Sequence, residues 1–188
     1  MYPFTILAVS DLAFEAGVEI VMHAFAEFYH DLTPKHKKQI KLIFIDKGGY
    51  TIPVLHWSEK LKIKSIVQVI NWKRIEKVEE AYHQSNFLFM PAKTKTYAGI
   101  MQALSKGLPV LSYRGAEREA IIDLTCGMLI DYMSTGQSIG DFAELLRMLY
   151  FDPAACKILK KGALKKYTTL LQTTGYPISK VVQTSAAS

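Results

Sequence analysis

Short apolar runs recur along the chain and predict a set of buried β-strands. Each run is rich in Val, Ile, Leu or Phe, shows little alternation between apolar and polar positions, and ends at turn residues. Such runs are typical of parallel sheets whose strands are buried on both faces by helices. The six runs span residues 4–9, 40–45, 65–70, 87–90, 109–112 and 128–130.

The segments between and after these runs place apolar residues at helical spacing. The expected helices span 18–29, 52–61, 76–85, 97–106, 117–124, 139–150 and 154–171. Strands and helices that alternate in this way predict the α/β class: a doubly wound, Rossmann-like parallel sheet of about six strands with helices on both faces. We assign residues 1–172 to this domain. Residues 173–188, with Gly175, Pro177 and a Ser/Ala-rich end, are expected to form a loose C-terminal tail.

The composition narrows the class of protein. Hydrophobic residues make up 49% of the 188 residues, which is enough for a packed domain and excludes a disordered chain. The two cysteines lack C-x-x-C spacing and the five histidines show no ligand spacing, so we expect no metal site. We recognise no signal peptide and no membrane-spanning run, and we expect a cytoplasmic protein. The formal charge of +6 keeps nucleic acid and anionic membranes open as partners.

Ligands of doubly wound sheets bind in the loops at the carboxyl ends of the strands, so these loops hold the candidate chemistry. None of them contains G-x-G-x-x-G or G-x-x-x-x-G-K-[ST], which disfavours a dinucleotide-binding or P-loop enzyme. The loops span residues 10–17, 46–50, 71–74, 91–98 and 113–119.

Several of these loops, with the segments around them, carry sequence pieces in a characteristic order. The piece at 100–110, I-M-Q-A-L-S-K-G-L-P-V, follows the pattern l-l-E-A-m-A-x-G-x-P-V. Other pieces lie at 9–18, 44–49, 69–72, 81–92, 115–119 and 126–130. Taken together, residues 4–167 resemble the C-terminal, nucleotide-sugar-binding domain of the group-1 family of retaining glycosyltransferases, which have the GT-B architecture.

The resemblance implies a donor site for a nucleotide diphosphate sugar, with no metal or other cofactor, and transfer of the glycosyl group to an acceptor hydroxyl. A complete GT-B enzyme has a second Rossmann-like domain that holds the acceptor. We therefore expect this chain to be inactive unless a further domain or a partner chain supplies that half. The donor-binding residues that the resemblance implies are Ser10, Gly17, Gly48, Asn71, Trp72, Thr94, Lys95, Tyr97, Ala98, Gln102 and Glu119.

The chain departs from the family pattern at charged positions of the donor site. Asp11 and Ala16 stand where the family has an Arg and a Lys that bind phosphate. Of the family's two glutamates, the second falls on Gln102, whose amide can still bond a ribose diol, and the first on Thr94 or Lys95. We therefore assign no catalytic residue. A catalytically degenerate domain that binds a protein or a glycan is the alternative, and half of a nucleotide-sugar epimerase is a weaker one.

Each candidate residue also has a plain structural interpretation. Lys93 and Lys95, just before an expected helix, either bind a diphosphate or form a solvated loop. Trp72 either stacks on a nucleobase or packs at a strand end. Gly48 either lets the backbone approach a ligand or only turns the chain, and Glu119 either contacts the donor or complements a helix dipole.

The last expected helix, 154–171, is basic and amphipathic, with no acidic residue. Its lysines either touch anionic lipid, which would place the protein at the inner face of the membrane, or form a solvated face. No basic segment is interleaved with aromatic residues, so the sequence gives nucleic acid little support as a partner. The lysines are Lys157, Lys160, Lys161, Lys165 and Lys166.

Overall fold

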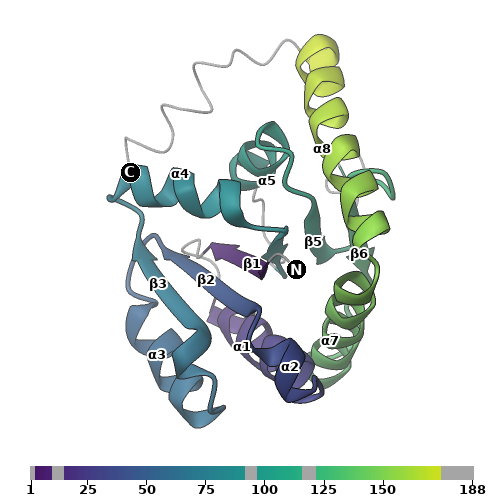
Figure 1. Ribbon diagram of the computed structural model, residues 1–188. Coiled ribbons are helices and arrows are strands. Elements are labelled where there is room, and N and C mark those ends of the chain that lie inside the picture. The colour runs from purple at the N-terminus through teal and green to yellow at the C-terminus, as the bar shows by residue number, and fades with distance from the viewer. Residues whose placement is uncertain (1–2, 10–14, 92–96, 116–121, 175–188) are drawn as a thin grey trace.

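In the computed structural model, six parallel strands form one sheet in the order β3-β2-β1-β4-β5-β6 (Figure 1). The structure describes residues 3–9, 15–91, 97–115 and 122–174. The strands are β1 (Phe4–Val9), β2 (Ile40–Asp46), β3 (Val67–Asn71), β4 (Phe87–Met90), β5 (Val110–Tyr113) and β6 (Gly127–Ile130). All six predicted strands are confirmed, and so is the doubly wound α/β class.

Helices cover both faces of the sheet (Figure 1). On one face, α1 packs against α7 and α3, with the short α2 nearby; on the other, α4 and α5 lie on the sheet and α8 packs on α5. Their bounds are α1 (Glu15–His30), α2 (Pro34–Lys37), α3 (Thr51–Lys60), α4 (Ile75–Gln84), α5 (Tyr97–Ser105), α7 (Thr135–Phe151) and α8 (Pro153–Thr174).

Burial of the strands follows their place in the sheet. Every residue of β1, β4 and β5 is buried, whereas the two edge strands, β3 and β6, are mostly half-buried. The central strands are therefore almost wholly apolar, with Thr5 and Ser112 as buried exceptions, because helices exclude water from both of their faces. Large rings such as Phe44, Phe87 and Phe89 are fully buried in this core.

The end of α5 shows why the helix stops where the sequence predicts. Gly107 adopts φ = +66°, in the left-handed region that glycine enters without a steric penalty. The N–H of Gly107 donates to the carbonyl of Leu104 (3.0 Å), and the N–H of Leu108 donates to the carbonyl of Ala103 (2.9 Å). This pair of bonds is a Schellman cap, which satisfies carbonyls that the end of a helix leaves free.

The structure corrects four details of the sequence prediction. Residues 34–37, for which the sequence predicts no helix, form α2, which begins at a proline. The start of the third predicted strand is instead a 3-10 turn, η1 (Lys64–Ile66). Of the helix expected at 117–124, residues 122–124 are not helical, and the rest lies outside the described residues. Helix α8 continues to Thr174. The division into a domain and a tail at residue 172 stays a prediction.

Candidate active site at the carboxyl ends of the strands

The strand order reverses between β1 and β4, which lie side by side in parallel with Ala8 opposite Phe89. Such a switch point opens a crevice at the carboxyl ends of the two strands, where ligands of this fold class bind. The loops that follow β1 and β4 fall outside the described residues. Four of the predicted donor residues lie in these loops or in the 116–121 segment: Ser10, Thr94, Lys95 and Glu119.

The frame around this crevice is fixed by contacts at the end of β4. The hydroxyl of Ser112, which is fully buried on β5, donates to the carbonyl of Met90 at 2.7 Å. A Cβ built on Gly99 would lie 2.9 Å from Cε of Met90, so the first turn of α5 packs directly against the Met90 side chain. The start of α5 therefore lies beside the crevice, and a helix N-terminus favours an anion.

Two predicted donor residues, Ala98 and Gln102, lie four positions apart on α5 and so share one face of the helix. Ala98 is exposed and Gln102 is half-buried. The hydroxyl of Tyr82, a buried residue of α4, donates to Oε1 of Gln102 at 3.3 Å. Burial, with the nearby charge of Glu79, raises the pKa of Tyr82, so its hydroxyl stays protonated as a donor.

This contact with Tyr82 was not anticipated, although Tyr82 lies in the 81–92 piece of the family pattern. The carbonyl oxygen of Gln102 already accepts one bond within the protein. The amide N–H groups are then the part of Gln102 that is best suited to a ligand.

The carboxyl end of β2 is organised by Asp46, a second residue that the sequence reasoning missed. The backbone N–H groups of Gly48 (2.9 Å), Tyr50 (3.1 Å) and Thr51 (2.9 Å), and the Thr51 hydroxyl (2.5 Å), all donate to the carboxylate of Asp46. Burial alone would raise the pKa of Asp46, but these hydrogen bonds outweigh it and hold the pKa below its ordinary value. Gly49 adopts φ = +84° within this turn.

The hydrogen bonds to Asp46 explain why Gly48 and Gly49 are present: they form the turn that leads into α3. The signal for it in the sequence was an Asp directly after an apolar run, followed by two glycines and a threonine. Contact of Gly48 with a ligand stays a prediction.

One backbone hydrogen bond ties the end of β3 to the end of β2, and a bond to the Asn71 side chain closes the turn that follows β3. The N–H of Trp72 donates to the carbonyl of Asp46 (3.1 Å), and the N–H of Lys73 donates to Oδ1 of Asn71 (2.9 Å). The Trp72 ring is half-buried and packs against the hydrophobic core, which agrees with its structural interpretation. Stacking of Trp72 on a nucleobase stays a prediction.

The structure therefore places the described candidates in two groups. Gly48, Asn71 and Trp72 lie at the neighbouring carboxyl ends of β2 and β3, while Ala98 and Gln102 lie on α5, across the switch point. Tyr97 is the first residue of α5, and its side chain is not among the described groups. Gly17 is buried in the first turn of α1.

Exposed apolar side chains surround this end of the sheet. Ile52 (78% exposed) follows β2, Ile75 (71%) follows β3, and Met133 (77%) follows β6. They leave an apolar rim uncovered at the ends where the crevice opens.

The basic helix α8 exposes three of its five lysines in one row. Lys157, Lys161 and Lys165 recur every four residues and are exposed. The other two are engaged: Lys160 donates to the carbonyl of Ser85 (3.1 Å), and Lys166 donates to the carboxylate of Asp123 (3.0 Å). Burial lowers the pKa of Lys160. The basic surface of α8 that a partner could contact thus consists of three lysines and not of the five that the sequence indicated.

The described part of the chain holds neither a membrane-spanning helix nor a cluster of metal ligands. No helix there has both the length and the apolar character needed to cross a membrane. Nor do these residues include a group of three or more His, Cys, Asp or Glu side chains placed to hold a metal ion.

The sequence profile of the glycosyl transferases group 1 family matches residues 2–166. The chain belongs to this family. Among curated proteins, none matches the chain.

Solved structures share the fold of this group 1 domain at low sequence identity. The pneumococcal O-GlcNAc transferase GtfA, in complex with UDP and GlcNAc, has a TM-score of 0.75 at 16% identity, over 96% of this chain and 36% of its own. HepE of Anabaena, in complex with UDP, has a TM-score of 0.71 at 14% identity, over 98% of this chain and 48% of its own. The C-terminal domain of LpcC, a group 1 family protein of Francisella tularensis, has a TM-score of 0.69 at 14% identity, over 89% of this chain and 85% of its own.

The fraction of each solved structure that this chain covers shows which part of those proteins it matches. It spans about a third to a half of the length of GtfA and HepE, but most of the LpcC C-terminal domain. The fold is therefore that of one Rossmann-like half of a GT-B glycosyltransferase, as the sequence predicted.

Proposed function

We propose that this chain is the donor-side domain of a group 1 glycosyltransferase and binds a nucleotide diphosphate sugar at the carboxyl ends of β1 and β4. The observation that carries the proposal is the switch point between β1 and β4, where Gly99 in the first turn of α5 lies against the side chain of Met90, and the bond from Ser112 to Met90 ties β5 to the end of β4. The family match and the presence of UDP in the GtfA and HepE structures support the same ligand class.

In this proposal the diphosphate lies at the start of α5, where the helix dipole and backbone N–H groups attract an anion. Lys93 and Lys95 supply the positive charge that Asp11 and Ala16 do not. The amide of Gln102 donates to a ribose hydroxyl, and Trp72 lies against the nucleobase. In this proposal the phosphate-binding cations, which the family pattern has in the first loop, lie instead in the loop before α5. The domain that binds the donor comprises residues 1–172.

Transfer requires a second half that binds the acceptor, because the chain covers only part of the solved enzymes that it resembles. The exposed Ile52, Ile75 and Met133 support a domain or partner chain that covers the carboxyl ends of the strands. Without that half, we expect donor binding and no glycosyl transfer.

Calorimetric titration with UDP-, GDP- and ADP-sugars tests the donor site. We expect one class of nucleotide to bind, and Gln102→Ala and Trp72→Ala each to weaken binding about tenfold, since a lost hydrogen bond or a lost stacking contact each costs about 1–2 kcal/mol. Gln172→Ala, an exposed change on α8, is the matched control. If no nucleotide binds at millimolar concentration, the donor proposal fails and the protein- or glycan-binding module takes its place.

We also propose that the exposed row of Lys157, Lys161 and Lys165 contacts anionic lipid, which would hold the protein at the inner face of the membrane. Each lysine near such a surface contributes about 1 kcal/mol. Reversal of all three to Glu is expected to weaken sedimentation with phosphatidylserine vesicles by a hundredfold or more, on the order of that sum. The control reverses three exposed lysines elsewhere, Lys35, Lys38 and Lys62. Equal loss in both variants, or equal binding to neutral vesicles, would contradict a specific contact.

A further inference from the structure

One edge of the sheet, the outer edge of β3, is unpaired among the described residues. β3 pairs with β2 through residues 67–71, and no described strand lies on its other side. The backbone N–H and C=O groups that point outward from an edge strand are free to pair with another strand. β3 is also only half-buried over Val67, Gln68 and Val69, so this edge is accessible.

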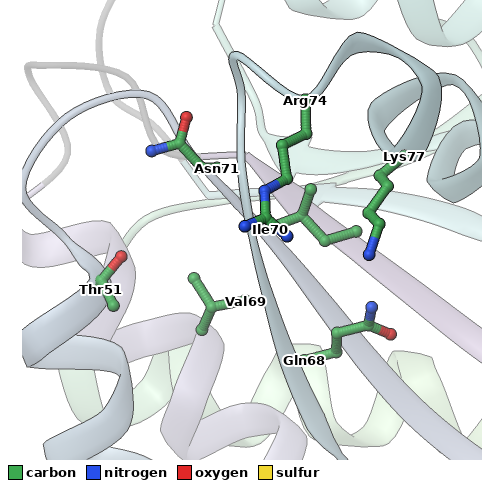
Figure 2. Close-up of a pocket in the computed structure, with 7 residues that line it drawn as sticks. All are labelled: Thr51, Gln68, Val69, Ile70, Asn71, Arg74 and Lys77. Carbon is green, nitrogen blue, oxygen red and sulfur yellow. The ribbon is translucent and has the colours of Figure 1, made fainter.

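A pocket of ≈ 260 Å³ straddles this edge (Figure 2). Successive side chains of β3 line opposite sides of it, because strand side chains alternate between the two faces of a sheet. The lining residues are Thr51, Val69 and Asn71 on the side of α3, and Gln68, Ile70, Arg74 and Lys77 on the side of α4. The pocket is smaller than the ~300–1,000 Å³ typical of sites for whole cofactors or drug-sized ligands.

The side of the pocket toward α4 is positively charged. Figure 2 shows the side chains of Arg74 and Lys77 both reaching from the start of α4 toward the strand, with the Lys77 ammonium facing the amide of Gln68. Both residues are exposed, and neither forms an ion pair with a described acid, including Glu76 and Glu80 of the same helix. Two cations that form no ion pair with a described acid therefore lie beside the edge of β3 that no described strand pairs.

We propose that the outer edge of β3 is a docking site for an extended acidic segment of a partner protein, which adds to the sheet as a further strand. In such strand addition the backbone hydrogen bonds supply affinity and alternate side chains supply specificity. Every second residue of the added segment lies beside Arg74 and Lys77 and carries a carboxylate. The residues between them lie beside Thr51 and Val69, where a β-branched side chain fits. The preferred segment thus alternates acidic and β-branched residues.

A second copy of this chain is a poorer occupant than an acidic partner. Its own β3 reads V-Q-V-I-N, without an acidic residue to meet Arg74 and Lys77. Antiparallel pairing of two β3 edges would also bring both pairs of cations to one seam, and like charges across neighbouring strands are destabilising.

Fluorescence anisotropy with a labelled synthetic peptide of alternating Glu and Val tests this site. We expect the peptide to bind and the Arg74→Glu, Lys77→Glu double variant to bind it about tenfold or more weakly, because two attractive charge pairs become repulsive. Lys60→Glu with Lys62→Glu is the control, since it changes the same charge at exposed positions of α3 and the turn that follows it. Far-ultraviolet circular dichroism checks that both double variants are folded.

Two further measurements separate strand addition from simple charge attraction. A Glu-Val peptide that is N-methylated at every backbone nitrogen keeps its charge but cannot donate backbone hydrogen bonds to β3, so we expect it not to bind. Hydrogen exchange should show protection of β3 amides only with the unmethylated peptide. The proposal is overturned if the methylated peptide binds equally well, if a Lys-Val peptide binds as tightly, or if the Glu-Val peptide does not bind. If sedimentation of the protein without peptide shows dimers, and Arg74→Glu with Lys77→Glu changes their amount, a second copy occupies the edge instead.

Discussion

The two ends of the parallel sheet differ in what covers them. At the amino end, the ring of Phe4 lies 6.0 Å from that of Phe28 and 5.3 Å from that of Tyr150. Tyr150 also bonds its hydroxyl to Nδ1 of His36 at 2.7 Å. Aromatic side chains from β1, α1, α2 and α7 therefore close this end with tilted and edge-to-face contacts, which add stability beyond the area that they bury.

At the carboxyl end, apolar side chains remain in solvent and polar groups point along the strands. Ile52, Ile75 and Met133 are each more than 70% exposed, and Asp46 gathers backbone N–H groups at the end of β2. The same six strands thus have one end packed with aromatic rings and one end where we propose that a ligand and a further domain bind. This division follows from the parallel sheet, in which all carboxyl ends lie together and loops there are free to vary.

The largest expected effect is at the closed end. Phe28→Ala removes a fully buried ring and is expected to lower the free energy of unfolding by about 3–5 kcal/mol, as truncation of buried aromatics does. Urea denaturation measures it, with Phe151→Ala, at a 59% exposed ring, as the matched control. A loss of stability no larger than that of the control would mean that the aromatic cluster does not close this end.

The second expected effect lies at the open end but concerns folding. Asp46→Asn weakens the hydrogen bonds that organise the turn before α3, at an expected cost of about 2–3 kcal/mol near pH 7. The folded pKa of Asp46 lies below its ordinary value of 3.8, so its contribution is present above that value and is lost as the pH falls through the lower, folded pKa.

The difference in unfolding free energy between wild type and Asp46→Asn should therefore shrink when urea denaturation is repeated between about pH 4 and pH 2. Asp131→Asn, which alters an exposed ion pair with Arg114, is expected to change stability by less than about 1 kcal/mol. If the difference in unfolding free energy between wild type and Asp46→Asn grew in acid, the pKa of Asp46 would not lie below its ordinary value.

A smaller effect separates ligand binding from folding at the open end. Tyr82→Phe removes the donor to Gln102 and is expected to cost about 1 kcal/mol of stability. It also lets the Gln102 amide turn, so we expect donor binding by calorimetry to weaken by a few fold, which corresponds to less than about 1 kcal/mol. Tyr29→Phe, at a half-buried ring of α1, is the matched control and should leave binding unchanged.

The smallest effect is expected at the exposed apolar rim. Ile75→Ser and Met133→Ser should each change the unfolding free energy by no more than about 0.5 kcal/mol, because these side chains are already in water. Urea denaturation measures this change under the same conditions as for Phe28→Ala. A stability loss similar to that of Phe28→Ala would mean that the two ends are not different in kind.

Sequence reasoning predicted the elements well where burial is two-sided and poorly where a structure is short or depends on distant partners. The runs that became β1, β4 and β5 are apolar apart from Thr5 and Ser112, so the sequence showed clearly that they are buried strands. The four-residue α2 and the turn η1 are too short to carry a periodic signal. For the candidate site, the chain pattern indicated Gln102 and Trp72 but not their partners, since Tyr82 and Asp46 reach them from other elements.

The sequence by itself determined the strands, the helices, their alternation and the family, because local periodicity and burial on two faces leave a direct trace in residue order. Only the tertiary structure decided which strand became an edge, which lysines of α8 stayed exposed, and which polar groups were already satisfied. These depend on strand order and on contacts between residues far apart in the chain. The outer edge of β3, with Arg74 and Lys77 beside it, exists as a surface only because no described strand is placed next to it.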